Sequence, residues 1–493
     1  MVSVPTNVQN SRSIADSTIR PAEYECYLDR GKCFIDPEVI HSHLETQRKP
    51  ESQKIRDIVD KSMELQRLEP TEVAALLQCD EPDLRIEMQS AAHRLKEKVY
   101  GRRIVLFAPL YASSLCHNDC LYCAFRRSNP NVTRRRLSHE EIQQEVRALI
   151  GAGHKRLVMV YGEHPSSGVH YIKETIEAAY SVKVDQGEIR RVNINAAPMS
   201  IGDLKSLGEV GIGTFQVFQE TYHRPTYERL HDRRTTKGNF LWRLYALHRA
   251  QEAGIDDVAI GALFGLYDYR FEVMGLVYHC IDLEERFGNV GPHTISFPRL
   301  EPASDTPFST NAPHRVTDEQ FAHLVTVLRL SVPYTGLILT AREPADVRRK
   351  VLPLGCTQID AGSNITIGGY ASGQQQADKT QFHLSDTRTL DDTIAELAEA
   401  GTITSFCTAG YRCGRTGERF MSLARTGKVQ RYCMPNAILT FLEYLQDYAA
   451  PQTRRVGTRL VRSEIQSIGD DHLRARVQQL AGRIRNGERD LYI

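Results

Sequence analysis

Apolar residues in the first hundred positions follow a helical period. Between residues 36 and 100, Leu, Ile and Met recur at three- and four-residue spacing, most clearly over 55–65, 72–77 and 84–100. The chain before them is polar at its start and shows no such period. We therefore expect residues 1–35 to be disordered or irregular, and residues 36–100 to form a helical N-terminal extension.

From about residue 101, short β-rich runs alternate with helical stretches. Strands are predicted at 103–109, 156–160, 192–196, 214–218, 257–263, 293–297 and 336–339. Helices are predicted at 138–151, 171–182, 201–209, 241–253, 274–287 and 319–330, the first of them capped by Ser138 with Glu141 three residues on. Repeated βα units indicate an α/β fold with a parallel barrel or a doubly wound sheet over residues 101–370. In such barrels the active site lies at the carboxyl ends of the strands.

The last third of the chain, residues 371–493, follows a different pattern. A polar stretch (374–386) and a helical segment (389–399) precede a Gly- and Arg-rich region that contains cysteines. A helix is predicted from 436 to about 448, followed by a basic tail. We treat this part as a separate C-terminal region.

Composition narrows the class of protein. The 493 residues suffice for a large domain with additions, and a formal charge of +1 indicates neither a nucleic-acid nor a membrane partner. No apolar run is long enough to span a bilayer, and the N-terminus lacks the apolar core of a secretory signal. The eleven cysteines indicate metal ligands and buried thiols in a reducing cytoplasm rather than a disulfide framework.

The strongest chemical signal is three closely spaced cysteines, Cys116, Cys120 and Cys123, directly after the first predicted strand. They supply three thiolates to a four-iron cluster and leave one iron without a protein ligand. The alternatives are three unrelated buried thiols, or zinc, which usually takes four ligands and lacks a local fourth here. The loop is predicted to lie at the carboxyl edge of the sheet.

A second loop, Tyr161-Gly162-Glu163, follows the second predicted strand. Its glycine permits close approach of a ligand to the backbone, and its carboxylate suits an amino group. A plain connecting loop is the alternative interpretation.

Several longer strings resemble the radical SAM aromatic amino-acid lyases. The strings are FAPLY (107–111), QETYH (219–223) with PTY (225–227), GLYDYR (265–270), GPHTIS (291–296) and VPYTG (332–336). The nearest resemblance is to the tyrosine lyase that matures the [FeFe]-hydrogenase cluster, and a more distant one is to 2-iminoacetate synthase of thiamine biosynthesis. The resemblance covers roughly residues 85–450 and implies a (β/α)8-type radical SAM barrel.

The resemblance also implies a reaction. A [4Fe-4S] cluster reduces S-adenosyl-L-methionine (SAM), and the resulting 5′-deoxyadenosyl radical removes a hydrogen from the amino group of L-tyrosine or a related aromatic amino acid. The Cα–Cβ bond then breaks to give p-cresol and dehydroglycine, which the hydrogenase maturase converts to carbon monoxide and cyanide. The implied partners are a one-electron donor of the flavodoxin or ferredoxin type and, for the maturase, other hydrogenase maturation proteins.

The resemblance also implies roles for individual residues that match positions of the family pattern. The three cysteines hold the cluster, and the SAM contacts implied are Tyr122, Tyr161, Gly162, Glu163, Glu220 and Arg299. Arg342 matches the arginine that binds the substrate carboxylate, for which a guanidinium fork is suited, and Ser363 is placed at the same end of the substrate. His293 is implied as a ligand of a labile fifth iron at a second iron–sulfur cluster.

The chain departs from the maturase pattern at that second cluster. The maturase uses a pair of cysteines separated by two residues and a third after twenty-two more. Here Cys407 and Cys433 occupy the outer positions, but the middle one is Gly410, and Cys413 lies three residues further on. Either Cys413 has taken over as a ligand, which the intact surrounding sequence favours, or the second cluster is absent and the reaction ends at tyrosine cleavage.

Other functions remain open at this point. A rival enzyme would keep the radical and change the amino acid, for example to tryptophan. A non-catalytic iron–sulfur scaffold or carrier is the alternative of another class, although a carrier has no need of a clamp for a substrate carboxylate.

Overall fold

The computed structural model describes residues 8–493, and its centre is a closed barrel of eight parallel strands. The strands, in order around the barrel, are β1 (Arg103–Ser113), β2 (Arg156–Tyr161), β5 (Arg191–Asn195), β6 (Phe215–Gln216), β7 (Val258–Gly261), β8 (Thr294–Ser296), β9 (Gly336–Leu339) and β10 (Gln358–Asp360). Pairing of β10 with β1 closes the ring. The predicted α/β barrel is confirmed.

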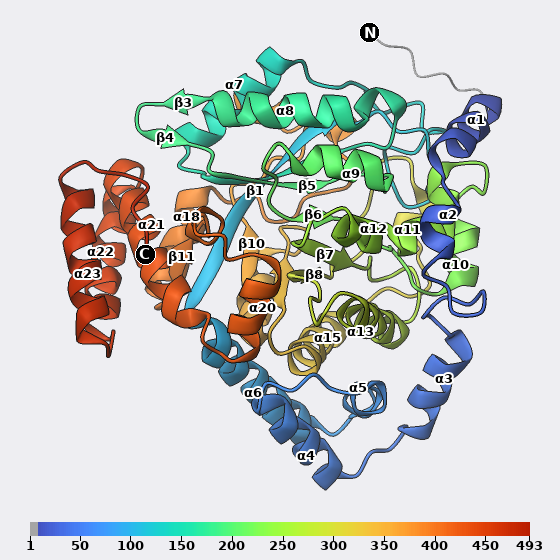
Figure 1. Ribbon diagram of the computed structural model, residues 1–493, viewed down its shortest axis with the longest axis horizontal. Helices are drawn as coiled ribbons and strands as arrows, with labels where there is room; N and C mark the ends of the chain where they lie inside the picture. The colour runs from blue at the N-terminus through green and yellow to red at the C-terminus, as the bar shows by residue number, and fades with distance from the viewer. Residues whose placement is uncertain (1–7) are drawn as a thin grey trace.

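Helices cover the outside of the barrel (Figure 1). They are α7 (His139–Gly151), α8 (Val169–Ser181), α9 (Ile201–Gly208), α10 (Arg224–Leu230), α11 (Phe240–Leu244), α12 (Ala246–Glu252), α13 (Tyr269–Arg286), α14 (Pro307–Thr310), α15 (Asp318–Ser331) and α16 (Ala345–Val351). A short hairpin of β3 (Lys183–Val184) and β4 (Gly187–Glu188) separates α8 from β5. Helix α7 begins as the sequence predicts, because Ser138 and Glu141 form a reciprocal capping box.

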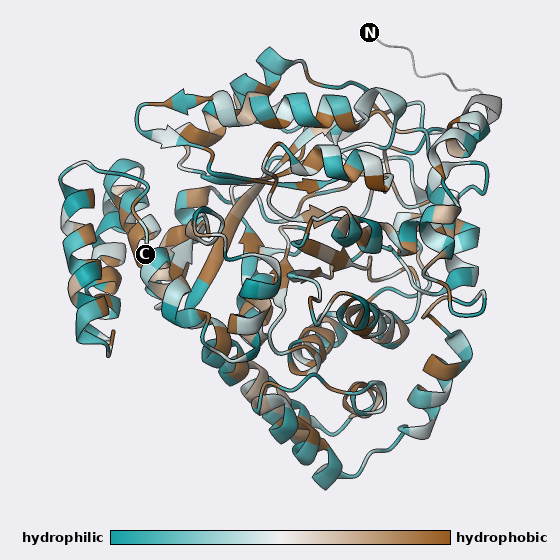
Figure 2. Cartoon of the chain, in the orientation of Figure 1, coloured by the Kyte–Doolittle hydropathy of each residue, from teal (hydrophilic) through white to brown (hydrophobic). Residues whose placement is uncertain are grey.

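Burial explains why these elements form. Every residue of β1 is buried, as expected of a parallel strand that is covered on both faces. Figure 2 shows the same division, with apolar barrel strands inside and mostly polar residues on the outer helices. The main core fills the layer between strands and helices, and a separate small cluster of Phe107, Val158 and Ile338 lies on the opposite face of the strands, inside the barrel.

The N-terminal part of the chain wraps one side of the barrel. Its helices are α1 (Val8–Thr18), α2 (Ala22–Glu25), α3 (Pro37–Thr46), α4 (Ser52–Met63), α5 (Pro70–Leu77) and α6 (Pro82–Tyr100). The last four form the expected helical extension, and α6 packs on α15. Helices α1 and α2 differ from the irregular chain expected for residues 1–35; they are short and pack against the barrel domain, so their sequence period is weak. The expectation for residues 1–7 lies outside the described residues.

The C-terminal region adds a ninth strand and a group of helices. The elements are α17 (Gly369–Ser372), α18 (Leu390–Glu399), β11 (Ile403–Ser405), α19 (Ala409–Arg412), α20 (Gly417–Arg425), α21 (Gln430–Asp447), α22 (Pro451–Gln466) and α23 (Asp471–Arg485). Strand β11 pairs with the first half of β1, opposite β10, while β2 pairs with the second half. The basic tail is therefore a helical pair that packs on α21 (Figure 1).

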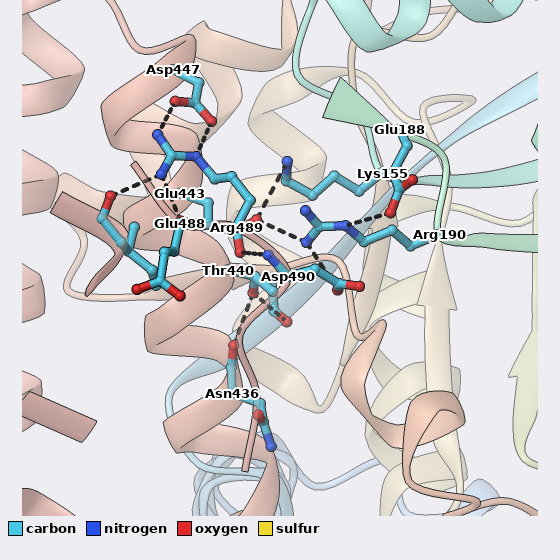
Figure 3. A network of polar contacts seen from close by, with 12 residues as sticks. Lys155, Glu188, Arg190, Asn436, Thr440, Glu443, Asp447, Glu488, Arg489 and Asp490 are labelled. Atoms are coloured by element: carbon cyan, nitrogen blue, oxygen red, sulfur yellow. Dashed lines mark hydrogen bonds and ion pairs between the residues drawn. The ribbon is translucent and has the colours of Figure 1, made fainter. Parts of the chain in front are cut away.

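A buried ionic network ties this region to the barrel (Figure 3). Glu443 of α21 is fully buried and accepts a 2.8 Å hydrogen bond from Arg190, beside β5. Lys155, which precedes β2, lies 3.6 Å from the same carboxylate. The backbone amide of Asp490 donates to the other oxygen of Glu443 at 2.7 Å. The network fixes the C-terminal residues of the chain beside the amino ends of β2 and β5.

Among residues 8–493, none of the helices has both the length and the apolar character needed to span a membrane.

Candidate active site

The three-cysteine loop follows β1 at the carboxyl end of the barrel, as predicted. Cys116, Cys120 and Cys123 all line one cavity of about 150 Å³ there. The other polar and charged residues that line it are Asn118, Glu163, Asn195, Glu220, Lys237, Arg243, Glu301, Arg342 and Gln381. Its aromatic lining consists of Tyr111, Tyr122, Phe125, Tyr161, Phe218 and Phe382. Chain segments from almost the whole barrel therefore meet at the cysteine loop.

Backbone and amide hydrogen bonds hold the loop in shape. The amide of Asn118 donates to Glu163 at 2.7 Å, and its oxygen accepts from the backbone of Lys237 at 3.0 Å. The backbone amide of His117 donates to the carbonyl of Glu163 at 2.9 Å. The first two strand–loop units are thus cross-linked, which fixes the direction of the cysteine side chains.

The residues present fit an iron–sulfur cluster. All three thiols are free, and side-chain amides approach two of them: Asn118 donates to Cys116 Sγ at 3.7 Å and Gln381 to Cys123 Sγ at 3.5 Å. Such donors stabilise thiolate ligands and tune a cluster. Burial raises the pKa of Cys116 to about 11, and a coordinated metal removes that proton. In residues 8–493, no three Cys, His, Asp or Glu side chains are arranged to hold a single ion. A four-iron cube binds each thiolate through a different iron, so its three cysteines need not converge on one point.

The second loop fits the amino-acid end of SAM. Glu163 uses one carboxylate oxygen for Asn118, while the other, Oε1, is buried without a hydrogen-bond partner among the described residues. An unsatisfied buried acceptor is costly, so a bound ammonium group at Oε1 would be strongly favoured. Gly162 packs so closely that an added Cβ would lie 2.2 Å from the carbonyl oxygen of Leu115. Tyr161, Gly162 and Glu163 all line the cavity, as does Tyr122, whose hydroxyl lies 2.8 Å from His231 Nε2.

Glu220 lines the same cavity but is already paired. Its carboxylate lies 2.7 Å from Lys237 Nζ and 3.3 Å from Arg243 Nη2. Burial disfavours its ionised form, yet Lys237 and Arg243 hold the pKa of Glu220 below its usual value. The backbone of Glu220 has a φ of +71°, which residues other than glycine rarely adopt. The surrounding structure therefore holds Glu220 in this conformation.

Arg342 provides the cation expected for a carboxylate. Its guanidinium lies over the ring of Phe382, with Cζ 3.5 Å from the ring centroid, and lines the cavity. In residues 8–493 it has no ion pair and no hydrogen bond. A stacked, unpaired and largely enclosed guanidinium is poised for a bidentate anion.

Two of the sequence-predicted residues are placed elsewhere. Ser363 donates to Asp360 at 2.8 Å and does not line the cavity. Arg299 binds Glu343 and Asp318 outside the cavity lining, with a 2.7 Å contact to the latter. The structure therefore brings neither side chain to the cavity. Carboxylate partners beside them satisfy both, and the sequence pattern gives no indication of such pairing.

A second, smaller cavity lies at the opposite end of the barrel, where the strands begin. We call it the lower cavity, and the cavity at the cysteine loop the upper cavity. His293, Cys407, Cys433 and Arg103 line its volume of about 30 Å³. His293 precedes β8 and its Nδ1 lies 3.0 Å from a carboxylate oxygen of Asp257, although the two are not aligned for a hydrogen bond. The resemblance implied that His293, Cys407, Cys413 and Cys433 belong to one site, and the structure brings three of them, His293, Cys407 and Cys433, to one cavity.

The lower cavity is strongly cationic. Arg103, Arg156 and Arg191 begin β1, β2 and β5 and are nearly fully buried, whereas Asp257 is the one buried carboxylate that contacts any of them in the described chain. Each keeps at least one side-chain N–H without an acceptor there. Burial opposes ionisation of Cys407, but these three guanidiniums hold its pKa below the usual value. The cavity therefore stabilises the thiolate of Cys407, whereas at Cys433 burial outweighs the influence of Arg103 and raises the pKa of the thiol.

Cys413 does not join that group. Gly410 lines the lower cavity, whereas Cys413, at the end of α19, is not among the residues that line it. The first turn of α19 directs Gly410 inward and carries Cys413 past the cavity. The arrangement in which Cys413 supplies the missing third thiolate is not present in this structure.

Sequence reasoning missed several residues of the upper cavity. Lys237, Arg243, Glu301, Gln381 and Phe382 line it from segments far apart in the chain. Glu301 was accessible in principle, because it follows the predicted strand at 293–297 by only a few residues. The others come from loops and helices without a motif, so no local signal marks them.

The geometry defines a class of enzyme: a parallel barrel with a three-cysteine loop after its first strand and a Gly-Glu loop after its second, both of which line one cavity. Sequence comparison agrees, since the radical SAM superfamily matches residues 110–273 and the biotin and thiamin synthesis associated domain matches residues 296–403. This protein is a radical SAM enzyme.

The family follows from individual relatives. The chain is 30% identical over 346 residues to 2-iminoacetate synthase of Escherichia coli (strain K12), covering 70% of this chain and 88% of the relative. A crystal structure of HydG, a maturase of the [FeFe]-hydrogenase, superposes with a TM-score of 0.90 at 44% identity, covering 93% of this chain and all of the other. HydG from Carboxydothermus hydrogenoformans gives a TM-score of 0.77 at 34% identity, covering 96% and 99%. The chain belongs to the family of radical SAM lyases that contains HydG and 2-iminoacetate synthase.

Proposed function

We propose that this enzyme cleaves the Cα–Cβ bond of L-tyrosine to p-cresol and dehydroglycine. The observation that carries the proposal is Arg342, an unpaired guanidinium in the same cavity as the three cluster cysteines. It suits the α-carboxylate of an amino acid. Dehydroglycine is 2-iminoacetate, the compound for which one relative is named.

Different residues of the cavity would bind the cluster, SAM and the substrate. The cysteines would hold the [4Fe-4S] cluster, and Gly162 and Glu163 would hold the methionyl end of SAM. When bound, these groups supply one-electron cleavage of the sulfonium and hence a carbon-centred radical. Arg342 would fix the substrate carboxylate, while Phe125 and Phe218 offer apolar surface for the aromatic ring. Enclosure by these side chains excludes water from the radical. We expect the electron to come from a flavodoxin or ferredoxin type of donor.

Product analysis tests this function. The anaerobically reconstituted protein, supplied with SAM, dithionite and L-tyrosine, should form p-cresol and 5′-deoxyadenosine in comparable amounts. L-Tryptophan under the same conditions should give no cleavage product above background. Cleavage of tryptophan instead of tyrosine would assign the enzyme to another aromatic amino acid, and 5′-deoxyadenosine without any cleavage product would refute the lyase assignment.

The proposal ends at tyrosine cleavage. In the maturase, carbon monoxide and cyanide form at a second cluster; among residues 8–493, two thiols, those of Cys407 and Cys433, line the corresponding cavity. The residues present therefore do not fit a cluster with three thiolates, and partnership with hydrogenase maturation proteins is not part of the proposal.

Iron content tests that restriction. The reconstituted wild type should contain about four irons per chain and one type of cluster by EPR. The triple variant Cys407→Ala, Cys413→Ala, Cys433→Ala should give the same values, because the upper cysteines are untouched. About eight irons in the wild type, falling to four in the variant, would show that a second cluster forms with rearranged ligands, and a carbon monoxide assay would then be warranted.

A further inference from the structure

Glu301 lies at a fixed position on the rim of the active-site cavity. It follows β8, whose extension pairs with the chain after β7: Phe264 donates to Pro298 at 2.9 Å and Leu300 donates to Phe264 at 2.8 Å. On the other side, the backbone of His383 donates to Pro302 at 2.8 Å. These bonds hold the backbone on both sides of Glu301, and its side chain lines the cavity beside the cluster cysteines.

The Glu301 carboxylate is half-buried and unpaired. In residues 8–493 it forms no hydrogen bond and no ion pair. Arg342, which faces the same cavity, is also unpaired. The two groups are close enough to influence each other electrostatically, yet they lie too far apart for an ion pair. Enclosed charges are normally paired, so the cavity presents a separated anion and cation that await counter-charges.

A zwitterionic amino acid supplies those two charges. Its α-carboxylate supplies a negative counter-charge for Arg342, and its α-ammonium group supplies a positive counter-charge for Glu301. A ligand without an amino group would leave Glu301 unpaired in the closed site. The pair therefore selects for amino acids over the corresponding deaminated acids.

We propose that Glu301 binds the α-ammonium group of the substrate and accepts its proton, so that the amine is neutral when a hydrogen atom is removed from it. This inference rests on the proposed function. Removal of a hydrogen atom from an ammonium group would leave a positively charged nitrogen radical, whereas removal from a neutral amine leaves an uncharged nitrogen radical, which forms more easily. The step is a proton transfer only: the N–H bond of the ammonium breaks, an O–H bond forms on Glu301, and the electron pair of the N–H bond stays on nitrogen.

The charged groups around Glu301 favour proton transfer from the substrate ammonium group. Burial and Glu343 raise the pKa of Glu301 to about 7, against the opposing influence of Arg342, Arg299 and Arg315. A carboxyl group with a pKa near neutrality can accept and release a proton at working pH. Because the ionised form is the acceptor, activity should be lost as the pH falls through the pKa and should be complete above it.

The test compares Glu301→Gln and Glu301→Asp with a matched control, Glu399→Gln, at the exposed end of α18. Initial rates of p-cresol formation would be measured from about pH 6 to pH 9 with reconstituted enzyme, SAM and dithionite. Binding of L-tyrosine and of 3-(4-hydroxyphenyl)propanoate, which lacks the amino group, would be measured by calorimetry in the presence of SAM. Iron content and SAM binding report whether each variant is intact.

Glu301→Gln should lower kcat by about 10²–10⁴-fold, the usual contribution of a general base. It should weaken tyrosine binding by less than about tenfold, because the amide oxygen still accepts a hydrogen bond. The wild-type rate should rise with pH through about 7, a limb absent in Glu301→Gln and partly restored in Glu301→Asp. Binding of the deaminated acid should be weak in the wild type and improve in Glu301→Gln.

The outcomes separate the two proposals. If the wild type forms p-cresol and Glu301→Gln does so within about threefold at every pH, the role of Glu301 is refuted and the lyase function stands. If the wild type forms no cleavage product, the proposed function fails and the role of Glu301 fails with it. If Glu301→Gln loses tyrosine binding and activity together, while its pH profile keeps the wild-type shape, Glu301 only positions the substrate and the proton transfer is refuted.

Discussion

Replacing Cys120 with alanine should abolish both 5′-deoxyadenosine and p-cresol formation, a loss of more than about 10³-fold. Cys116, Cys120 and Cys123 are the thiols of the upper cavity, and each would bind a different iron of the cube. With two thiolates left, the cluster is either lost or unable to present its open iron in the right orientation, and no other group in the site supplies radical chemistry. Iron and sulfide content, the EPR spectrum of the reduced protein and 5′-deoxyadenosine production measure the effect.

Cys26→Ala is the matched control for this substitution. Cys26 is an exposed free thiol at the end of α2, outside the cavity lining. The control should keep wild-type iron content and activity. A Cys120→Ala protein that retains a full cluster and still cleaves SAM would mean that another residue serves as ligand, and the assignment of the loop would have to be revised.

Local spacing explains why the cluster loop and the SAM loop could be predicted from sequence. Cys116, Cys120 and Cys123 lie within eight residues, so the loop itself sets their separation, whatever the rest of the fold does. Gly162 and Glu163 follow a strand directly, and all parallel strands of a barrel end at the same face. The fold was also predictable from sequence, because alternating strands and helices are compatible with few arrangements other than a parallel sheet or barrel.

Short and polar elements escaped prediction. The eighth barrel strand, β10, consists of Gln358-Ile359-Asp360, and three residues with two polar side chains carry no strand period. They are buried because β10 closes the barrel between β9 and β1. For α22 and α23 the sequence indicates only a basic tail, because each contains four arginines, although one apolar stripe on each helix packs inward.

The predicted roles of Arg299 and Ser363 depended on partners that only the fold reveals. Arg299 follows β8 at the carboxyl end of the barrel, where the cavity lies, yet its guanidinium forms an ion pair with Glu343 of a neighbouring loop. Arg342, one residue before Glu343, keeps its guanidinium free and stacks on Phe382 instead. The difference between a structural and a substrate-binding arginine is therefore set by which carboxylate each can reach, a long-range property.

Substitution of Arg342 by methionine should lower kcat/KM for L-tyrosine by about 10²–10⁴-fold. Two charge-assisted hydrogen bonds to a carboxylate contribute about 1.5–3 kcal/mol each, and every 1.4 kcal/mol is a factor of ten. Methionine keeps the apolar contact with Phe382 but supplies no donor. Arg342→Lys should recover only part of the loss, since an ammonium group neither stacks flat on the ring nor forms a paired fork.

The matched control is Arg349→Met on α16, whose exposed guanidinium binds Glu396 at the surface. Steady-state p-cresol formation gives kcat/KM, while SAM binding and iron content should be unchanged in all three variants because none of them changes a cluster cysteine or the Gly162-Glu163 loop. Reductive cleavage of SAM without p-cresol formation should persist in Arg342→Met, which separates a lost substrate from a lost cluster. An Arg342→Met enzyme with kcat/KM within about threefold of wild type would show that the substrate carboxylate binds elsewhere, and the amino-acid clamp formed with Glu301 would then have to be abandoned.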